Sequence, residues 1–126
     1  YGTPAEQIES MYAVASQLVN TSRPQEALPA SLWLSAVQPN EPRFHFLAGV
    51  CLQQIGKTEA AARFYAQAVL LDDSYAGAVY RLAECLWEQG EKNEARLLFD
   101  AVVDMGRDDG DLRELQQAAQ HRLTLH

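Results

Sequence analysis

The chain has few basic side chains, and this limits the partners it can bind. Its 126 residues include ten lysines and arginines, with lysine only at Lys57 and Lys92, against 17 aspartates and glutamates, for a net charge of −7. Affinity for a phosphate backbone depends on clustered basic residues. We therefore expect no nucleic-acid partner and no attraction to an anionic membrane. The charge suits a soluble protein whose partner is basic or apolar.

Long apolar runs and an export leader are also missing. No stretch approaches the roughly 20 apolar residues that span a bilayer, and no basic segment followed by an apolar one opens the chain. The start, Tyr1-Gly2-Thr3-Pro4, lacks a methionine, which indicates a fragment. With 48% hydrophobic residues, the chain is expected to form one domain with a real core.

What the chain does have is a repeat of 34 residues, which recurs at Tyr12, Phe46 and Tyr80 and again at Gly56 and Gly90. This period is typical of tetratricopeptide arrays, in which each unit is a pair of antiparallel helices and the units stack into a solenoid. The sequence therefore predicts an all-α solenoid of three helix pairs within residues 1–126. The repeats span 8–41, 42–75 and 76–109.

Glycine, proline and acidic residues mark the expected helix ends. Gly56 and Gly90 suit left-handed C-terminal caps, and Pro24 suits the first position of a helix. Asp111 with Glu114 resembles a capping box that opens a final helix, which should cap the open end of the array. The seven expected helices span about 5–19, 24–37, 42–55, 58–71, 76–89, 92–105 and 111–124.

Each first helix carries apolar or small residues at helical spacing, which should face the core. They are Met11, Val14, Ala15 and Leu18, then Ala48, Gly49 and Leu52, then Val79, Leu82, Ala83 and Leu86. The small residue of each set should let the partner helix approach closely. Pro29 breaks the pattern, because proline lacks an amide hydrogen, and it predicts a helix that bends or starts late.

The two cysteines, Cys51 and Cys85, are themselves 34 residues apart. Equivalent positions on packed helices should lie about 10 Å apart, which exceeds the roughly 7 Å between Cα atoms that a disulfide tolerates. Two free, buried thiols suit a reducing compartment, and we expect the cytoplasm.

A second stripe on each first helix, in steps of three, four and three residues, should line the concave face of the solenoid. The stripes are Glu9, Tyr12, Ser16 and Val19, then Arg43, Phe46, Val50 and Gln53, then Gly77, Tyr80, Glu84 and Trp87. The alternative is that the aromatic residues are additional core. Because partner sites favour aromatic anchors inside a polar rim, we predict that the three repeated aromatics line a groove and stay substantially exposed. Arg43 is the stripe's one cation, which argues against a clamp for acidic C-termini.

Residues 8–109 resemble the tetratricopeptide family. A narrower resemblance, to the bacterial type III secretion class II chaperones, rests on the three-repeat length with a capping helix, on Glu41-Pro42-Arg43-Phe44, on Ala83-Glu84-Cys85-Leu86 and on the opening segment 4–13. It implies a small cytoplasmic protein that holds a hydrophobic, pore-forming translocator before secretion, with an extended client segment in the concave groove. Whether the chain forms a homodimer is a question that the sequence leaves open.

Catalysis, metals and cofactors have little support in the sequence. The histidines are His45, His121 and His126, none at metal-ligand spacing from a cysteine, and no phosphate-binding glycine loop is present. His45 and Cys51 lie six residues apart on one helix, so they should point to different faces. We expect a non-enzyme. The alternative function is a tetratricopeptide adaptor for another soluble protein, such as a needle-subunit co-chaperone or a regulatory protein.

Overall fold

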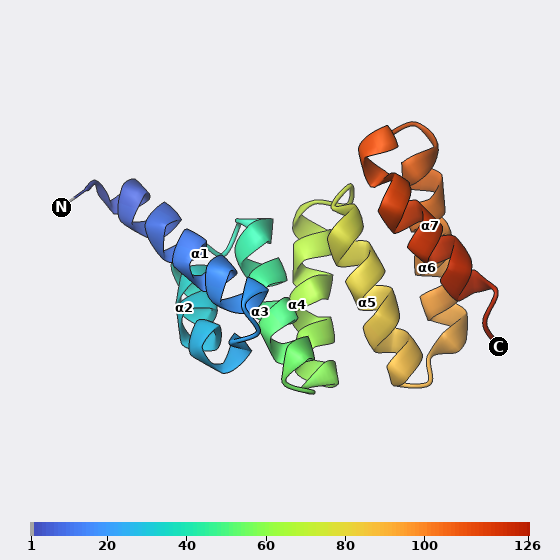
Figure 1. Ribbon diagram of the computed structural model, residues 1–126, viewed down its shortest axis with the longest axis horizontal. Helices are drawn as coiled ribbons and strands as arrows, with labels where there is room; N and C mark the ends of the chain where they lie inside the picture. Colours follow the sequence, from blue (N-terminus) through green and yellow to red (C-terminus); the bar gives the residue numbers. More distant parts are fainter. Residues whose placement is uncertain (1) are drawn as a thin grey trace.

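The computed structural model describes residues 2–126, and within that range it contains helices and no strand. The elements are α1 (Pro4–Asn20), α2 (Pro24–Val37), α3 (Pro42–Gln54), α4 (Thr58–Leu71), α5 (Ala76–Glu88), α6 (Lys92–Arg107), the short 3-10 helix η1 (Gly110–Leu112) and α7 (Arg113–Leu123). The helices follow one another along the long axis, from the N-terminus at one end to the C-terminus at the other (Figure 1). The predicted all-α array of three helix pairs and a terminal helix is confirmed.

The turn inside each helix pair uses the same backbone conformation. Gly56 and Gly90 both have φ of 85°, as their capping role predicts. Ser22 holds the equivalent position after α1, with φ of 62°, a left-handed conformation that is uncommon for a residue with a side chain. Pro24 and Pro42 stand at the start of α2 and α3, where the absent amide hydrogen costs no helical bond.

One expectation about helix ends is wrong, and one of the two alternatives expected at Pro29 is excluded. The Asp111–Glu114 box does not form; instead the Asp109 side chain accepts a hydrogen bond of 3.0 Å from the Asp111 amide and opens η1. The helix around Pro29 does not start late, because α2 runs unbroken from Pro24 to Val37. Pro29 is exposed and removes the bond to the carbonyl of Gln25, a residue that is also exposed, so water can replace that bond. A bend at Pro29 stays a prediction.

The core consists of three clusters stacked along the array, each filled by a large aromatic residue. Phe44 fills the cluster between α1, α2 and α3; Tyr65 fills the next, and Phe99 fills the one that reaches α7. Met11 and Val14, which we expected in the core, are exposed. Since α1 packs only against α2 and α3 among the more extensive helix contacts of residues 2–126, its remaining side stays open to solvent.

Small and sulfur-containing residues behave as the sequence predicts. An added Cβ at Gly49 would lie 2.6 Å from the Tyr65 ring, so glycine is what lets α4 approach α3. Cys51 and Cys85 are both buried and free. No helix within residues 2–126 is long and apolar enough to cross a bilayer.

Candidate functional site

A hollow of about 540 Å³ lies where the first helices of the three repeats meet. Its lining comes from α1 and the turn after it, from α3 and from one residue of α5: Tyr12, Ser16, Val19, Asn20, Ser22, Phe46, Leu47, Val50, Gln54 and Arg81. Tyr12, Ser16, Val19, Phe46 and Val50 belong to the predicted groove set. The structure thus brings five of the twelve predicted stripe residues together around one hollow, with apolar walls and polar groups beside them.

The three repeated aromatics are neither buried nor fully exposed. Tyr12 packs on Phe44 with ring centroids 5.4 Å apart, and Tyr80 packs on Phe99, also at 5.4 Å. Phe46 lies 5.6 Å from Tyr65, measured between ring centroids. Each therefore belongs partly to the core, and Tyr12 and Phe46 also line the hollow, whereas Tyr80 does not.

Arg43 joins the first two repeats beside the hollow. Its guanidinium pairs with Glu9 at 2.8 Å and with Glu41, and it lies over the rings of Tyr12 and Phe44, 4.8 and 5.4 Å from their centroids. The hydrogen bond from Arg43 lowers the pKa of Glu9, and the bonds to Glu9 and Glu41 raise the pKa of Arg43. Arg43 is thus charged and already satisfied by two carboxylates of its own chain.

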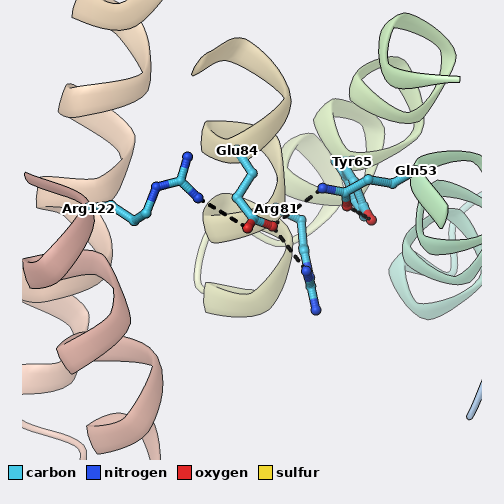
Figure 2. A network of polar contacts seen from close by, with 5 residues as sticks. All are labelled: Gln53, Tyr65, Arg81, Glu84 and Arg122. Carbon is cyan, nitrogen blue, oxygen red and sulfur yellow. Dashed lines mark hydrogen bonds and ion pairs between the residues drawn. The ribbon is translucent and has the colours of Figure 1, made fainter. Parts of the chain in front are cut away.

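A polar network connects the second and third repeats to the terminal helix (Figure 2). Glu84 lies at its centre: its carboxylate accepts hydrogen bonds from Arg81 at 3.0 Å, Arg122 at 3.3 Å and Gln53 at 3.4 Å. The Tyr65 hydroxyl donates to the Gln53 side-chain oxygen at 2.7 Å. The network therefore ties α3, α4 and α5 to the terminal helix α7.

Trp87 lies at the junction with α7, surrounded by cations. Lys92, Arg96 and Arg122 place their charged groups 4.9, 5.3 and 5.8 Å from its ring centroid. Seven predicted stripe residues do not line the hollow: Glu9, Arg43, Gln53, Gly77, Tyr80, Glu84 and Trp87. Their part in partner binding stays a prediction.

Four lining residues outside the predicted stripes form two pairs at equivalent positions of neighbouring repeats. Leu47 and Arg81 are 34 residues apart, and so are Asn20 and Gln54. The same repeat interval, applied one position beyond the predicted stripe, finds them. The predicted stripe and the hollow share the helices α1, α3 and α5, but the hollow lies at the edge of the stripe.

The residues considered for chemistry lie in separate surroundings. His45 has its Nε2 atom 2.7 Å from the Pro39 carbonyl oxygen, while Cys51 lies 3.9 Å from Ser31, measured from Sγ to Oγ. Burial raises the pKa of the Cys51 thiol, which disfavours the nucleophilic thiolate. Within residues 2–126 no group of three or more His, Cys, Asp or Glu side chains is placed to hold a metal ion.

Comparison with solved structures shows the same fold in secretion chaperones. The type III secretion translocator chaperone SycD of Yersinia enterocolitica has a TM-score of 0.91 at 20% identity, covering 97% of this chain and 84% of that one. SycD in complex with a peptide of the translocator YopD gives 0.89 at 21% identity, covering 94% and 90%. PcrH of Pseudomonas aeruginosa with the chaperone binding region of PopD gives 0.91 at 20% identity, covering 97% and 92%.

Sequence comparison is more direct about the family. A search of curated proteins finds no match. Two family models described as tetratricopeptide repeat do match, one over residues 12–76 and the other over residues 52–119, each more than half of the chain. The chain therefore belongs to the tetratricopeptide repeat family.

Proposed function

We propose that the chain is a non-catalytic chaperone of type III secretion. It binds an extended apolar segment of a translocator in the bacterial cytoplasm and holds it there before export. The observation that carries the proposal is the hollow between α1, α3 and α5, which five of the predicted groove residues line. Its support from relatives is the shared fold of SycD, solved with a peptide of YopD, and of PcrH, solved with the chaperone binding regions of PopB and PopD.

The lining suits an apolar side chain carried on an extended backbone. Val19, Phe46, Leu47 and Val50 provide an apolar wall, and full burial of one leucine-sized side chain is worth about 1.5–3 kcal/mol. Polar side chains beside that wall can bond the main chain of the client, which has no partner within an extended segment. Equilibrium binding of this kind shields a client from aggregation without covalent chemistry.

Co-expression tests the proposal. The chain is produced together with a translocator of the same bacterium, and the soluble fraction of the translocator is measured. We expect the native chain to keep the translocator soluble. Val50→Asp, which places a charge in the hollow, and Ser16→Arg, which fills it from α1, should fail to do so. Leu97→Asp, at an exposed position of α6 outside the hollow, is the matched control and should behave as the native chain.

Circular dichroism of each purified variant separates loss of binding from loss of fold. A translocator that stays soluble with both hollow variants would contradict the proposed site. A translocator that aggregates even with the native chain would contradict the chaperone function, and co-purification of a soluble regulatory protein in its place would favour the adaptor.

A further inference from the structure

Arg81 gives the hollow a charge that the rest of its lining lacks. Among the described residues that line the hollow, Arg81 is the only one with a side chain that is charged at neutral pH. Its side chain is 46% exposed and pairs with Glu84 at 3.0 Å, three residues along α5. The Arg81 side chain thus lines the hollow while about half of it is open to solvent.

Glu84 does not depend on Arg81 for its neutralising partner. Arg122 reaches the other oxygen of the same carboxylate at 3.3 Å, and its side chain is only 20% exposed. Packing holds Arg122 in place, since its guanidinium lies over the rings of Phe99 and Trp87, 5.0 and 5.8 Å from their centroids. Arg81 can therefore turn from Glu84 toward a bound partner without leaving a buried carboxylate unpaired.

From this arrangement we propose that Arg81 binds an acidic side chain of the client, next to the apolar side chain that enters the hollow. The inference rests on the proposed function and adds a sequence preference to it: an apolar anchor with Asp or Glu beside it. Guanidinium and carboxylate form paired, directional hydrogen bonds, which fix the register of an extended segment. Arg43, the other cation near the hollow, is already held by Glu9 and Glu41.

The charge of the whole chain makes this preference selective. With a net charge of −7, the surface as a whole repels acidic segments and attracts basic ones. A preference for an acidic residue beside the anchor must then come from a local cation, and it should follow Arg81. Electrostatic pairs of this kind set specificity more than total affinity.

An immobilised array of short synthetic peptides tests the inference. Each peptide carries one apolar anchor in an otherwise uncharged, extended-favouring sequence, and each position beside the anchor is in turn Asp, Asn or Lys. The native chain should bind the best Asp peptide about three- to tenfold more tightly than its Asn counterpart, as expected for a half-exposed charge-assisted hydrogen bond. Arg81→Gln should abolish that ratio, and Arg81→Glu should shift the preference to Lys.

Arg107→Gln is the matched control. Arg107 forms the same type of pair, three residues along its helix from Asp104 and also at 3.0 Å, but it lies outside the hollow. This variant should keep the native Asp-to-Asn ratio. A ratio that persists in Arg81→Gln, or that is absent from the native chain while apolar peptides bind, overturns the inference and leaves the proposed function standing. If no peptide binds the native chain, both fall.

Discussion

Phe46 shows how one side chain can serve the core and the hollow together. Its ring is stacked 5.0 Å from the Tyr75 ring, measured between centroids, and it also lines the hollow. We expect Phe46→Ala to weaken client binding by about 1–3 kcal/mol, as for a central anchor. It should also lower the free energy of unfolding, contrary to the nearly unchanged stability expected for a substantially exposed ring, because part of the ring is packed.

The loss of stability should be smaller than for a fully buried ring. Phe99, with no exposed surface, is the comparison, and Phe99→Ala should cost about 3–5 kcal/mol of unfolding free energy. Urea denaturation and calorimetric titration on both variants measure the two quantities. Equal destabilisation by the two substitutions, with client affinity intact for Phe46→Ala, would place Phe46 in the core alone.

The raised pKa values of a cysteine thiol and a tyrosine hydroxyl predict that the fold becomes less stable at alkaline pH. Burial raises the pKa of Cys85 from 9.0 to about 12, and burial likewise raises the pKa of Tyr75 from 10.0 to about 12. In both cases folding favours the neutral, protonated form. The stabilisation is therefore complete below the pKa of the unfolded chain and is lost as the pH rises toward that of the folded protein.

We expect the free energy of unfolding to fall between about pH 9 and 12, with a shallower fall for Cys85→Ala. Urea denaturation at a series of pH values gives both slopes. Thiol reagents applied at pH 8 provide an independent check, because only thiolate reacts. Rapid labelling of both cysteines in the folded protein at that pH would show that the thiols are accessible and the prediction is wrong.

Gly49 sets how closely α3 and α4 approach one another. The Tyr65 ring that blocks a Cβ at Gly49 is itself fully buried, so it has little room to move. Gly49→Ala should cost about 1–3 kcal/mol of unfolding free energy through overpacking. Gly110→Ala is the control: no atom lies within 4 Å of the added Cβ, and we expect almost no loss. Thermal denaturation that ranks the two variants the other way would contradict this reading.

The helices were predictable because residue types near their ends determine where each helix begins and stops. Proline starts, positive-φ glycines and the 34-residue interval placed each end within two residues. The exceptions depend on packing. Met11 and Val14 have core-like spacing, and only the array shows that α1 packs mainly on α2 and α3, which leaves these two side chains exposed.

The candidate site was predictable only in part, for the same reason. The interval between Tyr12 and Phe46 identifies the helices that line the hollow. Which edge of those helices faces it depends on how each repeat rotates against the next, a tertiary property that a stripe on a single helix does not contain. Arg81 was therefore missed, although it lies next to Tyr80 in the sequence.

At the scale of the whole molecule, stability should decline toward the two ends. In a solenoid each unit is stabilised by its neighbours, so terminal elements have fewer partners. Seven residues of α3 are buried, but only Ala15 in α1 and Ala119 in α7. We expect backbone amides of α1 and α7 to exchange with deuterium faster than those of α3, as measured by mass spectrometry. Comparable protection in α1 and α3 would contradict this.

The placement of the ion pairs predicts unequal stiffness along the length of the molecule. Glu84 and Arg122 brace α5 against α7 through a pair that is largely shielded from water, whereas Glu9 and Arg43 connect α1 to α3 through a more exposed one. Dissolved ions screen exposed pairs far more than shielded ones. Raising the ionic strength should therefore weaken the ion pair between α1 and α3 and leave the pair between α5 and α7 largely intact. Since α1 forms one wall of the hollow, we expect that wall to move more readily and to adapt to client side chains of different size.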